Sequence, residues 1–251
     1  MSLKISIVTC TYNSAQYLQK SIDSVLAQDY GNIEYIFVDG GSVDGTLDII
    51  KSAPIPYQLV GGVNTGISAA MNKGIEMATG DVVAHLHSDD YYLDPSMLRT
   101  VADAFTETGC EWLFGRIMTD LEGNLKPEGY VVPRYSYKRI LKGNFIPHPA
   151  TFVRKRLFDR VGYFNPGFKY AMDYDMWLRL GRIADPVQLD RHLAAFRQHA
   201  GSLSSANKLA ALKDDFDVRR QYMGTSPFAY TYHLAHYLVR RSRARRQMAG
   251  S

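Results

Sequence analysis

Two adjacent carboxylates in the segment His87-Ser88-Asp89-Asp90 carry the clearest chemistry in this sequence. They follow residues 82–86, a short apolar run typical of a buried strand. A nucleotide diphosphate arrives with a hard divalent cation across its phosphates, and such cations prefer carboxylate oxygens. Asp89 and Asp90 therefore predict a cation site in which the ion acts as a Lewis acid on a departing diphosphate. The alternative is a turn that caps the next helix, although Asp94 already fills that capping role.

Asp39 ends another apolar run, residues 33–38, and is followed by Gly40-Gly41-Ser42. Its carboxylate can accept a hydrogen bond from a ring N–H of a nucleotide base, while the glycines let a ligand approach the backbone. The same residues are also good turn chemistry. The first apolar run ends in Thr9-Cys10-Thr11-Tyr12-Asn13 and lacks the glycine pattern of a dinucleotide site, which argues against NAD.

The segments that must position these carboxylates alternate between strand-like and helical patterns. Buried strands are expected at residues 5–10, 33–38, 57–60 and 82–86. Helices are expected after Asn13 or Ser14, from residue 46, from residue 66, and from Asp94-Pro95 to about residue 105. This alternation predicts a parallel sheet covered on both faces, with ligands bound outside the carboxyl ends of the strands.

The pattern changes after Trp112. Residues 112–118 and 125–131 flank the turn signal Glu122-Gly123-Asn124 and predict an antiparallel pair. Helical pieces are expected at residues 136–142, 155–161 and 173–180, and one or two strands at 187–197. Trp112 and Trp177 are most simply core residues. The chain thus divides into an α/β domain over residues 1–204 and a helical extension over residues 205–251.

Composition and charge narrow the function classes. The chain has 251 residues, of which 46% are apolar and 22% charged, as in an ordinary globular protein. It has no apolar run long enough to span a membrane and two distant cysteines, Cys10 and Cys110. The strand-like start leaves no room for a signal peptide, so we expect a cytoplasmic protein.

The extension is basic, with nine Lys or Arg against three Asp from residue 205 onward, while the whole chain carries +4. A nucleic-acid protein would carry its basic surface on the folded domain, so we expect no nucleic-acid partner. The helical spacing of Phe228, Tyr232, Ala235, His236 and Val239, followed by an arginine-rich end, suits peripheral contact with the anionic inner face of the cell membrane. A solvated basic tail is the alternative.

Seven sequence blocks, in order over residues 3 to 204, resemble glycosyltransferase family 2. The blocks are Ser6-Ile7-Val8-Thr9-Cys10-Thr11-Tyr12-Asn13, Val38-Asp39-Gly40-Gly41-Ser42, Asn64-Thr65-Gly66-Ile67 with Ala70-Met71-Asn72-Lys73-Gly74-Ile75, Gly80-Asp81 with Ser88-Asp89-Asp90, His148-Pro149-Ala150-Thr151-Phe152-Val153-Arg154, Asp173-Tyr174-Asp175-Met176-Trp177-Leu178-Arg179 and Phe196-Arg197-Gln198-His199-Ala200-Gly201-Ser202. One block alone is weak, but seven in order are specific.

The resemblance implies the GT-A fold, a Rossmann-like three-layer α/β sandwich with a mostly parallel central sheet, and sugar transfer with inversion using Mg²⁺ or Mn²⁺. It places the nucleotide sugar at Thr9, Thr11, Tyr12, Asp39 and Asp89, the metal at Asp89, Asp90 and His199, and the catalytic base at Asp173. His87 and Met172 depart from the family pattern, in which Asp and Glu are common at these two positions.

A base at Asp173 also has a physical rationale. Inversion requires the acceptor hydroxyl to attack opposite the diphosphate, and one carboxylate on that face removes its proton. Asp175 is a competing base, and either residue can instead be a first-turn acid that stabilises the helix dipole. His148 is a weaker candidate for the site and is more simply a structural histidine.

The implied partners are a nucleotide-sugar donor, with UDP as the default, and a glycan or lipid-linked acceptor, as in bacterial cell-surface polysaccharide or glycolipid synthesis. The rival function is an inactive nucleotide-sugar-binding or scaffold protein of the same fold, supported by His87 and Met172. A nucleotidyltransferase would need a glycine-rich phosphate loop after the first strand, and this chain has none there.

Overall fold

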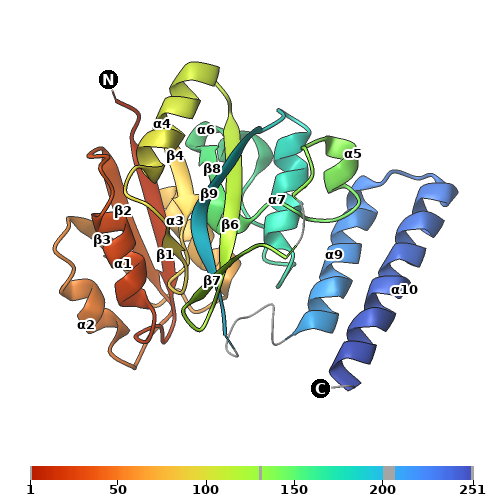
Figure 1. Cartoon of the computed structure of the whole chain (residues 1–251), viewed down its shortest axis with the longest axis horizontal. Coiled ribbons are helices and arrows are strands. Elements are labelled where there is room, and N and C mark those ends of the chain that lie inside the picture. Colours follow the sequence, from red (N-terminus) through yellow and green to blue (C-terminus); the bar gives the residue numbers. More distant parts are fainter. Residues whose placement is uncertain (1, 130–131, 200–206, 250–251) are drawn as a thin grey trace.

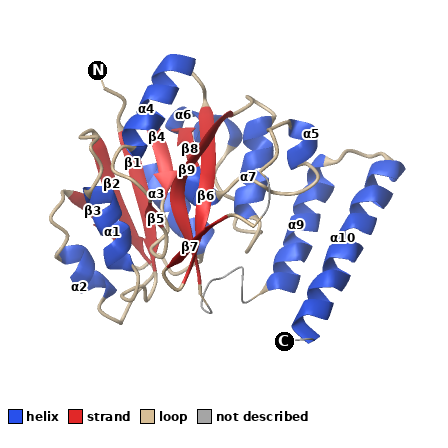
Figure 2. Ribbon diagram, in the orientation of Figure 1, coloured by secondary structure: helices blue, strands red, loops and turns tan. Residues whose placement is uncertain are grey.

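The computed structural model describes residues 2–129, 132–199 and 207–249 as a three-layer α/β protein with a helical hairpin at one side (Figures 1 and 2). In the described residues, nine strands form one sheet. Along the sheet, the order is β3 (Tyr57–Val60), β2 (Ile33–Asp39), β1 (Ile5–Thr11), β4 (Val82–His85), β8 (Thr151–Arg154), β6 (Trp112–Leu121), β9 (Val187–Gln198) and β5 (Tyr91–Tyr92), and β7 (Asn124–Pro127) pairs with β6.

The predicted parallel strands form one continuous half of the sheet. Strands β3, β2, β1 and β4 are parallel neighbours, and β8 then runs antiparallel to both β4 and β6. All seven residues of β1 are buried. Ile5 and Ile7 belong to the core on one face and Val8 and Cys10 to the core on the other, as the two-residue period of a strand requires.

Helices cover both faces of the sheet. One layer contains α1 (Leu18–Leu26), α2 (Thr46–Lys51) and α4 (Met97–Thr108); the other contains α3 (Ile67–Met77), α6 (Lys155–Val161) and α7 (Met172–Gly181), with the short α5 (Tyr137–Ile140) and the 3-10 turn η1 (His148–Ala150) at its edge. Helix α3 lies very close to β1, because a Cβ at Gly74 would come within 2.2 Å of the Val8 side chain. Glycine is therefore required there.

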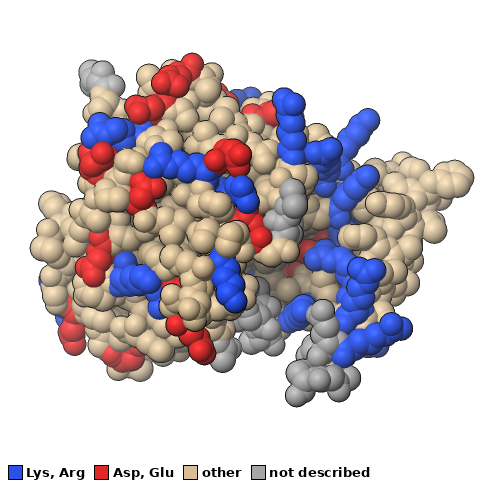
Figure 3. Space-filling model, viewed as in Figure 1, with Lys and Arg blue, Asp and Glu red and all other residues tan. Residues whose placement is uncertain are grey.

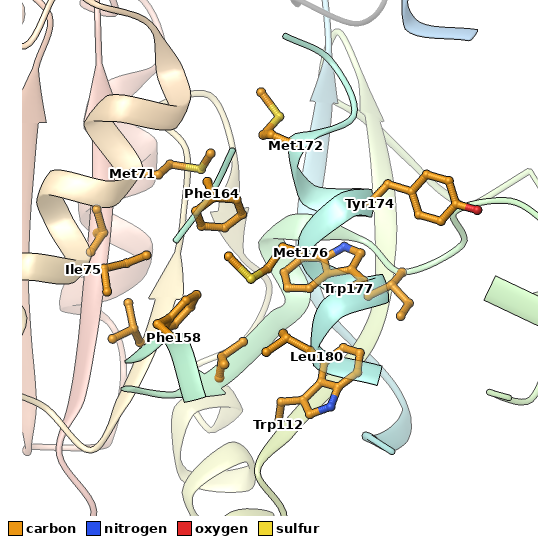
Figure 4. Packing of buried hydrophobic residues seen from close by; sticks show 14 of the residues in the cluster. Met71, Ile75, Trp112, Phe158, Phe164, Met172, Tyr174, Met176, Trp177 and Leu180 are labelled. Carbon is orange, nitrogen blue, oxygen red and sulfur yellow. The ribbon is translucent and has the colours of Figure 1, made fainter. Parts of the chain in front are cut away.

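The core on the α3 and α7 face of the sheet, to which Val8 and Cys10 belong, contains both tryptophans, as expected from the sequence (Figure 4). Their rings stack with centroids 5.9 Å apart, and the indole N–H of Trp112 donates to the Ala184 carbonyl at 2.8 Å. Figure 4 shows Met176 on α7 pointing toward Phe164 and Phe158. This packing fixes α7 against the sheet.

Several boundaries differ from those predicted. Helix α1 begins at Leu18, after a turn in which Ser14 accepts backbone hydrogen bonds from Tyr17 and Leu18. Helix α4 begins at Met97, because Asp94 caps the preceding turn through Ser96. The antiparallel pair is confirmed as β6 and β7, which ends at Pro127; the prediction reached residues 130–131, which lie outside the described residues.

In its described residues, the extension forms the helices α9 (Lys208–Tyr222) and α10 (Pro227–Ala249); α9 stands beside α7, and α10 lies on the far side of α9 (Figure 1). Val218 of α9 belongs to the same core as Trp177, and Phe216 stacks on Tyr237 of α10 at 4.9 Å. The predicted boundary between residues 204 and 205 lies outside the described residues. Within the described part of the chain, no helix is both long enough and apolar enough to cross a bilayer.

Candidate active site

The parallel register of β1 and β2 brings Thr11 and Asp39 together at the carboxyl ends of the two strands. Their Cα atoms are register partners, and the Thr11 hydroxyl donates to Asp39 Oδ1 at 2.8 Å. Ser42 Oγ donates to the same oxygen, and the backbone N–H groups of Gly41 and Ser42 donate to Oδ2, both at 2.8 Å. Burial raises the pKa of Asp39, but these hydrogen bonds outweigh it and hold the pKa below its ordinary value.

The Asp39 carboxylate thus organises its own loop. Gly41 has a φ of +95°, which places its N–H toward the carboxylate at little cost only because the residue has no Cβ. Next to this loop, Tyr12 is 66% exposed, and its ring passes so close to Gly40 that a Cβ there would lie 3.3 Å away. The loop and the exposed ring form one rigid edge suited to a flat ligand.

Thr9 lies deeper than the other predicted nucleotide contacts. Its side chain is fully buried, and its hydroxyl faces the hydroxyl of Tyr35 at 3.4 Å. The structure therefore groups Thr11, Tyr12 and Asp39 at the strand ends and places the Thr9 side chain in the interior of the sheet.

Asp89 and His199 meet although they are 110 residues apart. Asp89 follows β4, His199 follows β9, and the ring Nε2 lies 3.1 Å from Asp89 Oδ2. Tyr17 packs on the His199 ring with centroids 4.6 Å apart. Both side chains of the pair remain partly exposed, at 27% and 22%. This is the one pairing among the predicted metal residues that the described part of the chain shows directly.

Asp90 is used inside the protein instead. It is 1% exposed, and its Oδ1 accepts the backbone N–H of Arg197 at 3.1 Å. Burial, followed by the charge of Asp89, raises the pKa of Asp90 well above its ordinary value. Among the described residues, no three His, Cys, Asp or Glu side chains are grouped to hold a metal. Asp90 thus attaches the loop after β4 to strand β9.

Arg197 anchors the loop that carries Asp89. Besides the backbone contact to Asp90, its Nε donates to the Asp89 carbonyl at 3.2 Å, and its guanidinium lies over the rings of Tyr17 and Tyr91. The Arg197-x-His199 pattern was visible in the sequence, but the role of Arg197 as the link between β4 and β9 was not predicted.

Three histidine rings, those of His85, His87 and His148, pack against one another near the end of β4. The rings of His87 and His148 stack at 4.9 Å, and His85 lies 5.6 Å from His148. Burial lowers the pKa of all three, for His85 to about 3, so the rings are neutral at neutral pH. His148 packs in turn on Trp177, which links the β4 end of the site to α7.

Asp173 is partly buried in the first turn of α7 and is held by two donors. Its Oδ1 accepts the N–H of Tyr174 at 2.6 Å, and its Oδ2 accepts the side-chain amide of Asn144 at 3.2 Å. Burial raises its pKa to about 7, and the negative charge of Asp215 acts in the same direction against the two hydrogen bonds. Asn144 gave no signal in the sequence, because it lies in an irregular loop 29 residues earlier.

Asp175 has a structural environment. It is 2% exposed, forms an ion pair with Arg179 at 2.8 Å, and accepts the hydroxyl of Tyr222 from α9 at 2.5 Å. Arg179 in turn donates to the carbonyls of Val161, Gly162 and Tyr163, which end α6. The structure thus separates the two acids, since Asp175 ties three helices together and Asp173 does not.

Comparisons with known proteins agree on one family. The family model described as "Glycosyl transferase family 2" matches residues 6–163, well over half of the chain. An "uncharacterized glycosyltransferase" of Mycobacterium tuberculosis is 30% identical over 196 residues, covering 76% of this chain and 74% of that protein. The chondroitin synthase of Escherichia coli is 28% identical over 84% of this chain but only 31% of the synthase.

Solved structures show the same fold at low identity. The S. aureus TarS 1-349 structure in complex with UDP-GlcNAc has a TM-score of 0.72 at 21% identity, covering 95% of this chain and 72% of that one. The mannosyltransferase PcManGT from Pyrobaculum calidifontis, in complex with GDP-Man and Mn²⁺, has a TM-score of 0.68 at 15% identity, covering 100% and 76%. The predicted GT-A fold is confirmed.

Proposed function

Because the chain belongs to glycosyltransferase family 2, we propose that it transfers a sugar from a nucleotide-diphosphate donor to an acceptor hydroxyl with inversion. The observation that carries the proposal is the setting of Asp173, whose carboxylate is held by Asn144 and the Tyr174 N–H in the first turn of α7. A carboxyl group whose pKa lies near neutrality is matched to the task of a general base at cellular pH. Asp175, two residues along, is committed to Arg179 and Tyr222 and does not compete for this role.

An inactive scaffold of the same fold has no need for this arrangement. A buried carboxylate lowers the free energy of unfolding at any pH above its ordinary pKa. Asn or Ser would cap the helix N-terminus equally well without this cost. His87 and Met172 differ from the residues common in the family, but neither changes the setting of Asp173. Met172 packs in the core, and His87 stacks on His148.

The donor set at the end of β4 fits a divalent cation that is shared with a diphosphate. Asp89 supplies a carboxylate and His199 an imidazole nitrogen, and magnesium-type sites take few protein ligands beside phosphate and water. When bound there, Mg²⁺ or Mn²⁺ supplies Lewis-acid stabilisation to the departing diphosphate. The Mn²⁺ of the mannosyltransferase PcManGT supports this assignment by similarity of fold.

The remaining steps, nucleoside binding and proton transfer, are assigned to residues of the chain itself. Tyr12 and the loop organised by Asp39 bind the nucleoside, with Thr11 holding the carboxylate in place. Asp173 accepts the proton of the acceptor hydroxyl as that oxygen attacks the anomeric carbon from the face opposite the diphosphate. Asn144 keeps the carboxylate oriented for this step.

For the donor we propose a UDP-sugar, and for the acceptor a glycan or lipid-linked glycan in cell-surface polysaccharide or glycolipid synthesis. The relative in E. coli is named a chondroitin synthase, and TarS binds UDP-GlcNAc. The chain spans about a third of the chondroitin synthase, so it corresponds to one part of that protein.

Helix α10 suits contact with the anionic inner face of a membrane, where a lipid-linked acceptor would lie. Phe228 is 88% exposed, Tyr232 and Val239 are about half exposed, and Arg243 and Arg246 lie on the same side of the helix. His236, predicted for this face, instead accepts a hydrogen bond from Arg219 at 3.0 Å. Figure 3 shows Lys and Arg side chains gathered over the α9 and α10 side of the face in view.

The membrane contact is tested by flotation with vesicles of phosphatidylcholine alone or mixed with phosphatidylserine. Arg243→Ser with Arg246→Ser should reduce binding to the anionic vesicles, and UDP-sugar turnover in solution should stay unchanged. Deleting α10 would be a poorer test, because it would uncover Phe216 of α9. Equal binding of parent and variant at moderate salt would exclude this face as the contact.

The experiment that tests the enzymatic proposal is nucleotide release from a panel of UDP-GlcNAc, UDP-glucose, UDP-galactose and GDP-mannose in the presence of Mn²⁺. The parent should release nucleotide from at least one donor. Asp173→Asn should keep donor affinity by calorimetry but lose turnover, whereas Asp48→Asn, an exposed first-turn acid on α2, should lose neither. Binding of a donor with no turnover on any acceptor or in water would favour the scaffold function.

A further inference from the structure

Helix α9 contacts the segment that leads into the first turn of α7. Oδ2 of Asp214 accepts the backbone N–H of Lys169 at 3.0 Å and that of Tyr170 at 2.9 Å. Charge-assisted hydrogen bonds of this kind are about twice as strong as neutral ones. They fix the course of the chain three to four residues before Asp173.

The same helix contacts the loop that supplies Asn144. Arg219 is fully buried, and its NH1 donates to the carbonyl of Lys142 at 3.1 Å. Asn144, two residues further on, donates to Asp173. Burying a guanidinium costs several kcal/mol in desolvation, so Arg219 is not part of a solvated helix face. Its contact holds the loop that orients the carboxylate.

Asp215 adds a charge to this arrangement. It lies between α9 and α10, paired with Arg240 at 3.2 Å and close to Arg219, and its carboxylate raises the pKa of Asp173. Three other charged groups of α9 and α10 act on Asp215, namely Arg219, Arg240 and the neighbouring Asp214. The extension therefore contacts the segment before Asp173 and the loop that carries Asn144, and it adds a negative charge that acts on Asp173.

We propose that α9 is a positioning element of the active site, which fixes Asp173 from two sides through Asp214 and Arg219. On this view, residues 208–222 belong to the catalytic unit and are not a dispensable appendage. The inference rests on the proposed role of Asp173 as the base. Asp39, Asp89 and His199 lie on other elements, so loss of the α9 contacts should spare donor binding.

The first test replaces Asp214 in the 251-residue chain and follows release of UDP from the UDP-sugar that turns over fastest. Asp214→Ala should lower kcat about tenfold or more, because a base displaced by about 1 Å loses much of its rate. The donor Kd should stay within about twofold, since α9 carries none of the donor contacts. Asp214→Asn keeps an oxygen that accepts the two N–H groups and should restore most of the rate.

A matched control lies on the same helix. Asp217 pairs with Lys213 at 2.6 Å and Arg220 at 3.6 Å, all on α9. Asp217→Ala should leave kcat and the donor Kd unchanged, although it removes the same group from the same helix. Thermal melts of both alanine variants separate loss of positioning from loss of the fold.

The second test uses charge and does not depend on the stability of the first variants. Asp215→Asn removes a negative charge that raises the pKa of Asp173, so the acidic limb of the pH profile of kcat/KM should move to lower pH. Asp217→Asn should leave the profile in place. A purely structural role of α9 would not move this limb.

The outcomes separate the two proposals. If Asp173→Asn is inactive while Asp214→Ala keeps its kcat, or while Asp215→Asn keeps the parent pH profile, the role of α9 is wrong and the base assignment stands. If Asp173→Asn keeps its turnover, the base assignment fails and the role of α9 fails with it. Should Asp214→Ala not fold, the pH profile of Asp215→Asn decides.

Discussion

Replacing Asp173 with Asn should stabilise the protein at about pH 8 while abolishing sugar transfer. In the folded state, burial raises the pKa of this carboxyl from 3.8 to about 7. Between these values, the folded protein keeps a proton that the unfolded chain has already released. Folding stability therefore falls as pH rises through this range, because ionising Asp173 in the folded state is unfavourable. Asn has a similar shape and no charge, so it escapes this penalty.

The size of the effect follows from the pKa and the contacts. A rise of about three pH units at about 1.4 kcal/mol each amounts to a penalty of about 4 kcal/mol above neutral pH. The amide of an Asn at position 173 would face the amide of Asn144, which loses one hydrogen bond at a cost of about 1 kcal/mol. The variant should thus gain about 3 kcal/mol at pH 8 and lose about 1 kcal/mol at pH 4.

Urea unfolding of parent and variant at about pH 4, 6 and 8 measures the difference directly, and UDP release from a UDP-sugar gives the rate. Asp48→Asn on α2 is the control for loss of a first-turn acid and should show no gain at pH 8. A variant that is less stable than the parent at pH 8 would refute the reasoning. Asp173 would then be an ionised partner of the helix dipole and not a base poised near neutrality.

Three further predictions concern the proposed metal site, Asp39 and Asp175. Asp89→Asn and His199→Ala should each lower UDP release by orders of magnitude, and EDTA should abolish the parent's activity until Mn²⁺ is added; full activity in EDTA would exclude the metal site. Asp39→Ala should weaken binding of free UDP about tenfold by calorimetry, because the loop loses four hydrogen bonds, whereas equal affinity would make Asp39 a turn residue. Asp175→Asn should cost about 3 kcal/mol of stability, because the Arg179 guanidinium loses its carboxylate partner, but it should spare the donor Kd. Loss of turnover in a variant of parent stability would move the base to Asp175.

The sequence determined the architecture of the parallel half of the sheet, because its signals are local. Short apolar runs followed by polar loops, with helical periods between them, are enough to predict parallel strands whose carboxyl ends share an edge. Asp39 ends β2 and Asp89 follows β4, so the sequence alone places both carboxylates at that edge. The antiparallel hairpin followed from its turn residues in the same way, with Glu122 and Gly123 at positive φ.

The roles of neighbouring acids were decided only by tertiary contacts. Asp89 and Asp90 are adjacent, yet one faces His199 and the other is buried against Arg197. The sequence could name both carboxylates but could not divide their work, since the groups that distinguish them are more than 100 residues away.

The helical extension shows the same limit most clearly. Its charge excess indicated a solvated or membrane-facing tail, and Phe228, Tyr232 and Val239 of α10 are indeed exposed, although membrane contact stays a prediction. Arg219, however, is fully buried and reaches the carbonyl of Lys142, 77 residues earlier, while Asp214 reaches the entry of α7. Helical periodicity records which residues share a face, but not which distant backbone groups that face will meet. A buried ion held by a carbonyl leaves no local pattern, so only the packed structure could join α9 to Asp173.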